Sequence, residues 1–135
     1  GTEPFDGCYE RYASATALVK MVSEIDSSLT NGRQIFADLE RPEIKAVVNK
    51  WIDEIVLGLT TLIHIFNPSC IVLGGGIMVQ PYILEQINVR IPQMVMSSFS
   101  HVQISSAKLG NSAGLLGAYH LAAQKLEMSD LSDQK

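Results

Sequence analysis

The chain has 135 residues, of which 47% are hydrophobic and only 18% are charged, a composition that favours one packed domain with some apolar surface left for a partner. Ten basic and fourteen acidic residues give a net charge of -4, and the absence of long runs of like charge argues against nucleic acid as a partner of this segment. No apolar stretch is long enough to cross a membrane, no secretion signal opens the chain, and two cysteines are too few for a disulfide framework. We therefore expect a reduced, cytoplasmic setting without membrane attachment.

The first half of the chain carries the periodicity of helices. Apolar residues at three- and four-residue steps predict a helix over 12–26, and a short helix is expected over 33–40. Arg41-Pro42-Glu43 is a helix start signal, because proline at the first helical position loses no hydrogen bond. From there an unbroken apolar stripe predicts the central core helix, which ends at Asn67-Pro68.

The second half alternates strands and helices. Residues 70–73 form a short apolar run that predicts a strand buried on both faces, and the alternation over 102–107 predicts a second strand. A helix is expected from about residue 80, bent or ended by Pro92, and a last helix over 111–127 before a polar tail at 128–135. This order predicts an α/β domain over 1–127 with parallel strands. Two strands are too few for such a sheet, so we expect the others to come from elsewhere.

Gly74-Gly75-Gly76 lies between the first predicted strand and the following helix. Where side chains are absent a ligand can approach the backbone N–H groups of such a corner, so we interpret it as a candidate nucleotide site. The dinucleotide fingerprint would need glycine at the position of Val79, which disfavours a Rossmann cofactor. A tight turn that binds nothing is the plainer alternative.

A second small-residue corner, at 110–114, follows the second predicted strand and includes Ala113 and Gly114. Carboxyl ends of neighbouring parallel strands meet at one side of a sheet, so the two corners are predicted to face a common cleft. Capping of the last helix by Asn111 or Ser112 is compatible with this hypothesis and is the alternative to it.

Three other residues could carry chemistry. Glu10 stands near a helix start, where a carboxylate either accepts hydrogen bonds from sugar hydroxyls or simply meets the positive helix end. Cys8 lacks the neighbours of a zinc site and is expected to be buried, and His64 is expected to be a hydrogen-bonded core side chain. The sequence shows no Ser-His-Asp order, no metalloprotease H-E-x-x-H motif and no P-loop, so these classes lack support.

Three stretches resemble the ROK family of sugar kinases and repressors, and they span nearly the whole chain: Gly7-Cys8-Tyr9-Glu10-Arg11-Tyr12-Ala13-Ser14, residues 67–77 and residues 110–122. They are similar in turn to the family's Gly-Cys-x-Glu signature with its following Ala-Ser, to its Asn-Pro-x-x-Ile-Val-Leu-Gly-Gly-Gly nucleotide motif, and to its Ala-Gly-Leu-Leu-Gly-Ala helix. The resemblance implies the C-terminal lobe of the actin-like, ribonuclease H-like ATPase fold, helix-rich with an incomplete parallel sheet.

The resemblance also implies roles for the candidate residues. Glu10 would contact sugar hydroxyls, Gly74-Gly75-Gly76 would pass close to the adenosine of ATP, and Ala113-Gly114 would help to wall the nucleotide cleft. The complete enzyme would transfer a phosphoryl group from ATP, with Mg²⁺, to a hexose-type hydroxyl. We expect no cofactor bound to this chain, and a homodimer is implied.

Departures from the family pattern limit what this segment should do. Gly1 and Glu3 stand where the zinc signature has its first two cysteines, so no zinc is expected. The family's phosphate loop and catalytic aspartate belong to an N-terminal lobe that would precede Gly1, so we expect a partial kinase that is inactive alone. The alternatives are the sugar-sensing half of a ROK transcriptional repressor and a non-catalytic interaction module.

Overall fold

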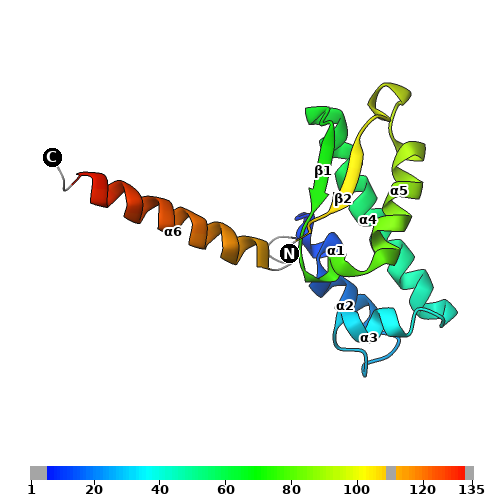
Figure 1. The fold of residues 1–135 in the computed structure, drawn as a ribbon. Coiled ribbons are helices and arrows are strands. Elements are labelled where there is room, and N and C mark those ends of the chain that lie inside the picture. The colour runs from blue at the N-terminus through cyan, green and yellow to red at the C-terminus, as the bar shows by residue number, and fades with distance from the viewer. Residues whose placement is uncertain (1–5, 109–111, 133–135) are drawn as a thin grey trace.

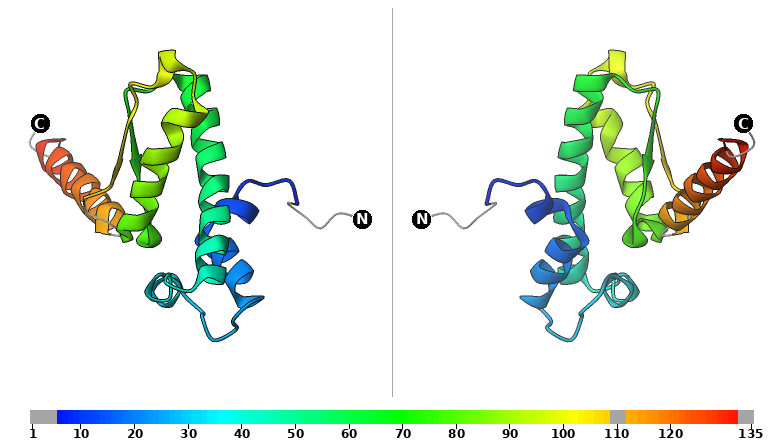
Figure 2. Two further views of the ribbon diagram at one scale, coloured as in Figure 1. Left: turned by 90° about the vertical axis from the view of Figure 1, so that its right-hand side faces the viewer. Right: turned by 90° about the vertical axis from the view of Figure 1, so that its left-hand side faces the viewer.

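The computed structural model describes residues 6–108 and 112–132. Helices α4 and α5 cover one face of a small sheet, and α1 and α2 lie on the side of α4 away from that sheet (Figures 1 and 2). In chain order the elements are α1 (Glu10–Ala13), α2 (Ala15–Ser23), α3 (Gly32–Ala37), α4 (Pro42–Phe66), β1 (Cys70–Leu73), η1 (Gly76–Val79), α5 (Pro81–Met94), η2 (Ser97–Phe99), β2 (Gln103–Ser106) and α6 (Ser112–Ser132). Within the described residues no helix is both long and apolar enough to span a membrane.

The single helix predicted over 12–26 is wrong, because Ser14 divides it. Its backbone is extended, with φ -76° and ψ 160°, and its hydroxyl oxygen accepts a hydrogen bond from the Ala17 N–H at 3.1 Å. Its carbonyl oxygen accepts the indole N–H of Trp51 at 2.9 Å. Serine offers the backbone such an alternative to helical bonding, so α1 ends and α2 begins at this residue.

The predicted central helix is confirmed as α4. Pro42 occupies its first turn, and it ends at Asn67, whose left-handed conformation (φ 45°) precedes Pro68. The buried face of α4 carries Ile44, Val48, Trp51, Ile52, Ile55, Val56, Leu59, Thr60 and Ile63. The far end of the predicted stripe is not buried, because Phe66 is 71% exposed. The core therefore thins toward the end of α4.

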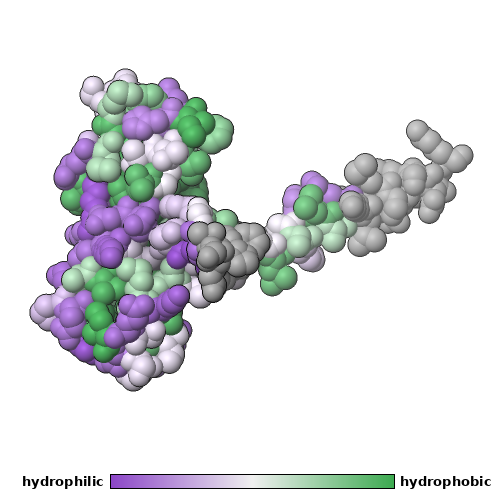
Figure 3. Space-filling view, turned by 180° about the vertical axis from the view of Figure 1, so that it is seen from behind, coloured by the Kyte–Doolittle hydropathy of each residue, from purple (hydrophilic) through white to green (hydrophobic). Residues whose placement is uncertain are grey.

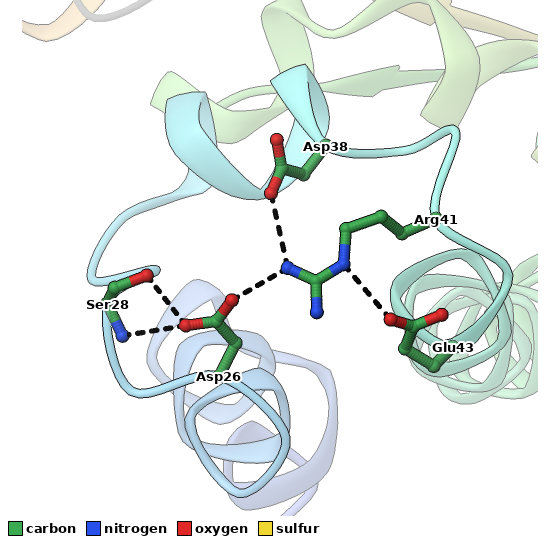
Figure 4. Close-up of polar contacts among 5 residues, drawn as sticks. All are labelled: Asp26, Ser28, Asp38, Arg41 and Glu43. Atoms are coloured by element: carbon green, nitrogen blue, oxygen red, sulfur yellow. Dashed lines mark hydrogen bonds and ion pairs between the residues drawn. The ribbon is translucent and has the colours of Figure 1, made fainter.

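An ion-pair cluster fixes the start of α4 (Figure 4). The Arg41 guanidinium lies 2.6 Å from an Asp26 oxygen, 3.0 Å from Glu43 and 3.4 Å from Asp38. Asp26 also accepts the N–H of Ser28 at 3.0 Å and its hydroxyl at 2.6 Å. These contacts join the loop after α2, the end of α3 and the first turn of α4.

The two strands pair in parallel, with Cys70 opposite Gln103 and Leu73 opposite Ser106. Ile71 and Leu73 pack on the core, whereas Cys70 and Val72 point to the other face and are exposed, Val72 by 61%. The prediction of a strand buried on both faces is therefore wrong in this structure. The prediction of an incomplete parallel sheet is confirmed, since the described residues supply two strands.

Helix α5 continues through Pro92 to Met94. Because Pro92 stands in the last turn, it removes at most one hydrogen bond near the helix end, and the helix stops two residues later. The observed end of α5 thus lies two residues after Pro92, the residue at which the sequence predicts a bend or an end.

Helix α6 projects from the body as an arm (Figures 1 and 3). It runs to Ser132, past the predicted end at residue 127 and into the expected polar tail. Its large apolar side chains are uncovered, with Leu115 75% and Tyr119 73% exposed. A helix that buries this little against its own body needs other contacts to stabilise it.

Candidate functional site

The glycine corner after β1 has the geometry of a strand-to-helix turn. Gly75 has φ 109° and ψ 154°, a backbone conformation that residues with a side chain rarely adopt. The chain then enters the single 3₁₀ turn η1, closed by hydrogen bonds from Met78 N–H to Gly75 oxygen and from Gln80 N–H to Ile77 oxygen. Helix α5 starts only at Pro81, so a short 3₁₀ turn separates the corner from the predicted helix.

A pocket of about 260 Å³ opens between this corner and the end of β2. The N–H of Ala107 donates to the Leu73 carbonyl at 2.8 Å, which brings the carboxyl ends of the two strands together. No described atom lies within 4 Å of the point that a Gly74 Cβ would occupy, so the corner faces open space. The pocket is lined by Leu73, Gly74, Gly75, Met78, Val79, Ser106, Ala107 and Lys108.

Gly76 does not line this pocket. It borders a neighbouring hollow of about 280 Å³ together with Gly32 and Arg33 of α3 and with Gln80. A Cβ on Gly32 would lie 3.2 Å from the Ile77 side chain, so Gly32 lets η1 pack closely against α3. The structure thus brings Gly74 and Gly75 together with the end of β2, and sets Gly76 against α3.

The second predicted corner is a helix start. Ala113 and Gly114 fall within the first turn of α6, whereas Gly110 and Asn111 lie outside the described residues. Helix α6 begins at the end of the sheet where β1 and β2 both finish (Figure 1). Gly114 is not among the described residues that line the pocket beside Gly75. The two corners therefore start from the same end of the sheet, and their common cleft stays a prediction.

Glu10 is the first residue of α1 and lies on a separate, wider groove. That groove, of about 580 Å³, is lined by Cys8, Glu10, Arg11, Ser14, Thr16, Ala17 and Lys20. Glu10 is exposed, and among the described residues its carboxylate has no hydrogen-bond or ion-pair partner. It is free to accept hydrogen bonds from a neutral, hydroxyl-rich ligand.

Cys8 is exposed beside Glu10, so the expectation that it is buried is wrong. The turn before α1 holds it at the surface, since Tyr9 takes the contact with α4. Within the described part of the chain no group of three His, Cys, Asp or Glu side chains is placed to hold a metal ion. Cys8 by itself does not fit a four-ligand zinc site, and the expectation of no zinc stays a prediction.

His64 is hydrogen-bonded but only partly buried. Its Nε2 accepts the Met96 N–H at 3.4 Å, and its ring meets the edge of Phe99 with centroids 4.9 Å apart. These contacts tie the end of α4 to η2, which is a structural role.

Sequence reasoning missed Lys108 and Ser106 at the pocket beside Gly75, and it missed the role of Tyr9 beside the Glu10 groove. Lys108 and Ser106 reach the pocket because the register of the two strands ends there. Register depends on the tertiary pairing of β1 with β2, so no local signal marked either residue. Tyr9 belongs to the Gly7–Ser14 stretch, but the carbonyl oxygen that its hydroxyl contacts lies more than forty residues away in α4.

In open α/β sheets ligands bind at the carboxyl ends of the strands, and the glycine corner of this helix-rich lobe lies at that edge. A model of the ROK family matches residues 1–125. The chain belongs to the ROK family.

Similar proteins include sugar kinases. The chain is 27% identical over 122 residues to an N-acetyl-D-glucosamine kinase of Yersinia enterocolitica, covering 89% of this chain and 40% of that protein. It is 33% identical over 97 residues to a beta-glucoside kinase of Listeria innocua, covering 70% and 32%. It is also 34% identical over 115 residues to an uncharacterized protein of Clostridium perfringens, covering 80% and 39%. The chain thus spans no more than two-fifths of the length of these relatives.

The structure resembles a ROK family glucokinase from Streptomyces griseus, solved in complex with glucose and AMPPNP. The TM-score is 0.74 at 26% identity, and the match covers 87% of this chain and 45% of the glucokinase. The predicted fold, the C-terminal lobe of the actin-like ATPase architecture, is thereby confirmed.

Proposed function

We propose that this chain is the C-terminal lobe of an ATP-dependent sugar kinase, which transfers a phosphoryl group to a hydroxyl of a hexose-type sugar. The lobe supplies the adenosine side of the nucleotide site and part of the sugar pocket. Two of the relatives named above are kinases of N-acetyl-D-glucosamine and of beta-glucosides, and a structural neighbour is a glucokinase. These names support a sugar as the substrate class.

The pocket beside Gly74 and Gly75 carries this proposal. It lies at the carboxyl ends of two parallel strands, the edge at which open α/β sheets bind ligands. Gly75 holds a conformation suited to glycine, and open space stands where a Gly74 side chain would be. A nucleotide can therefore approach the backbone directly. Gly76 and the Ala113-Gly114 turn of α6 would flank this site.

Glu10 would bind the sugar. A carboxylate with no partner among the described residues, on a groove of about 580 Å³, accepts hydroxyl hydrogen bonds that are stronger than those between neutral groups. The corner that would bind ATP and the groove that holds Glu10 have no lining residue in common. The two substrates would thus occupy distinct parts of the lobe.

The lobe needs further protein to complete these sites. The outer face of the sheet exposes Val72, and α6 presents Leu115, Tyr119 and Leu121 at between 63% and 75% exposure. Apolar surface on this scale marks an interaction site. An N-terminal lobe would cover it, and a homodimer in the cytoplasm is the assembly we propose.

Phosphoryl transfer depends on positioning both substrates and on stabilising the charge that develops at the transferred group. Mg²⁺ bound with ATP would supply part of that charge neutralisation. Within this chain Glu10 orients the sugar and the Gly74-Gly75 backbone orients the nucleotide, while the base that accepts the hydroxyl proton would belong to the other lobe. We expect the chain alone to be inactive.

An assay of ATP-dependent phosphorylation tests this division of labour. The isolated chain is incubated with ATP, Mg²⁺ and D-glucose, N-acetyl-D-glucosamine or a β-glucoside, and ADP release is followed with Glu10→Ala as the matched control. We expect no difference between the two proteins. Reproducible turnover above the Glu10→Ala background would contradict the half-enzyme proposal.

A further inference from the structure

The side chain of Tyr9 fastens the turn that carries Glu10 onto α4. Its hydroxyl lies 3.1 Å from the carbonyl oxygen of Glu54 and 3.2 Å from that of Ile55. The Tyr9 carbonyl in turn accepts the N–H groups of Tyr12 at 3.0 Å and Ala13 at 3.1 Å. The residue that anchors the turn therefore also starts helix α1, one position before Glu10.

Gly58 makes room for this contact. A Cβ at Gly58 would lie 2.3 Å from the Cζ and the hydroxyl oxygen of Tyr9, far inside van der Waals contact. Glycine is unfavourable inside a helix, and Gly58 stands in the middle of the longest helix of the described chain. The close approach of the Tyr9 ring explains why a glycine occupies this position.

A second contact holds the other end of the same segment. The buried Trp51 donates its indole N–H to the carbonyl of Ser14 at 2.9 Å. Both ends of the stretch from Tyr9 to Ser14 are thus attached to α4, and Glu10 lies between the two attachments.

The hydroxyl of Tyr9 remains a hydrogen-bond donor over a wide range of pH. Burial, followed by the nearby Glu54 carboxylate, raises the pKa of the Tyr9 phenol above its usual value. A phenol is already protonated at neutral pH, and the raised pKa extends this to more alkaline pH. The single hydroxyl proton is shared between the two carbonyl oxygens of α4.

We propose that Tyr9, seated on Gly58, is a positioning residue that orients the Glu10 carboxylate toward the groove and thereby sets the affinity of this lobe for a neutral sugar. The inference rests on the proposed function, in which Glu10 accepts hydrogen bonds from sugar hydroxyls. Tyr9 acts through the backbone of α1 and contacts α4, not the sugar.

Amide hydrogen exchange of the chain tests the attachment without any sugar. Tyr9→Phe removes the two hydroxyl contacts and should speed exchange at Tyr12, Ala13 and Ser14, whose N–H groups bond within this turn, while the amides of α4 keep their protection. Tyr12→Phe is the matched control, because its hydroxyl donates to the Asp6 carbonyl at 2.8 Å and, among the described residues, not to α4. It should leave the carbonyl contacts of Glu54 and Ile55 in place and exchange at Ser14 unchanged.

Gly58→Ala gives a test whose outcome depends on Tyr9. In the chain with Tyr9 the new methyl group displaces the ring, so exchange in α1 should rise although alanine favours the helix. In a Tyr9→Ala background there is no ring to displace, and Gly58→Ala should have no further effect on α1. Equal effects of Gly58→Ala in both backgrounds would overturn the proposed seating of Tyr9.

Sugar affinity, measured by ligand-observed NMR with D-glucose, tests the positioning role. Tyr9→Phe should weaken binding about two- to tenfold, the range expected for the loss of one hydrogen bond, and should add nothing to the loss caused by Glu10→Gln. Faster exchange in α1 with unchanged glucose affinity would overturn the positioning role alone. Glucose binding that is absent, or insensitive to Glu10→Gln, would overturn the proposed sugar site and the positioning role with it, while the exchange data report separately on the attachment.

Discussion

At the scale of single residues, backbone conformation separates the two glycines that line the candidate nucleotide pocket. Gly75 has φ 109°, whereas no positive φ is found for Gly74. Neither glycine has a described atom within 4 Å of its missing Cβ. A side chain is thus disfavoured at Gly75 by strain, and at Gly74 only by what enters the pocket.

The matched substitutions Gly75→Ala and Gly74→Ala should therefore differ in stability. Alanine at position 75 is forced into a sparsely populated backbone region, which costs on the order of 1–3 kcal/mol, while alanine at position 74 should change the free energy of unfolding by less than about 0.5 kcal/mol. Urea denaturation measures both. Equal destabilisation by the two variants would contradict the described geometry of the corner.

Several residue-level features were within reach of the sequence, and others were not. The cap at Asn67-Pro68 and the start at Pro42 follow from local backbone preferences, so they could be predicted. The break at Ser14 was not predicted: its hydroxyl makes a local cap, but the contact to its carbonyl comes from the indole of Trp51, 37 positions away, which no local pattern shows. The exposure of Cys8 likewise depends on the seating of Tyr9 against α4.

At the scale of elements, α4 organises the molecule, and its two sides have different environments. Ile63 is fully buried, whereas Ile65, two positions later on the same helix, is 66% exposed. The Arg41 cluster holds the opposite end of α4 through contacts that are partly open to solvent. Apolar packing therefore runs along α4 from Ile44 to Ile63, and the ion pairs add to it at the start of the helix.

Ile63→Ala and Ile65→Ala compare the two sides of α4 directly. Truncation of the buried side chain should lower the free energy of unfolding by about 2–5 kcal/mol, because it removes apolar contacts and leaves a cavity. Truncation of the exposed one should stay within about 0.5 kcal/mol. Chemical denaturation in urea gives both values, and a large loss for Ile65→Ala would show that α4 is covered on this side.

The Arg41 cluster should make stability depend on pH in acid. Hydrogen bonds from Ser28 and then from Arg41 lower the pKa of Asp26 from 3.8 to about 2. A carboxylate with a lowered folded-state pKa adds stability above its unfolded pKa and loses it as the pH falls through its folded pKa. The contribution of Asp26 is thus complete above about pH 4 and declines toward pH 2.

Asp26→Asn checks this dependence. The variant should lose less stability between pH 4 and pH 2 than the unsubstituted chain, and the difference should shrink at high salt, because the pair is partly exposed and is screened. Melting temperatures measured across this pH range report the slope. Identical slopes for the two proteins would show that Asp26 does not titrate with folding.

At the scale of the whole molecule, the outer face of the sheet and helix α6 both expose apolar side chains. The outer face of the two-stranded sheet is open at Val72, and α6 stands away from the body with Leu115 and Tyr119 exposed (Figure 3). The chain covers 45% of the glucokinase that it resembles. An incomplete sheet could be predicted from the strand count alone, since the number of strands can be read from periodicity. The direction of α6 could not, because the pattern of residues along a helix does not say how the helix is oriented relative to the sheet.

The candidate sites, too, could be predicted only in part from local sequence patterns. The position of Gly74 and Gly75 at the end of a strand was visible in the sequence, because glycines after a short apolar run mark such a corner. Lys108 and Ser106 complete the pocket only through the pairing of β1 with β2. Local patterns thus located one wall of the pocket, and tertiary pairing supplied the other.

Titration of the chain with ATP, followed by its melting temperature, tests the proposed nucleotide corner most directly. A ligand that binds only the folded state must raise the melting temperature. No ATP is expected to stay bound to the isolated chain, but ATP added at millimolar concentration should occupy the corner. We therefore predict a saturable increase that Gly74→Ala diminishes without changing the melting temperature in the absence of ATP. No increase in the unsubstituted chain, or an increase that Gly74→Ala leaves intact, would contradict a nucleotide site at this corner.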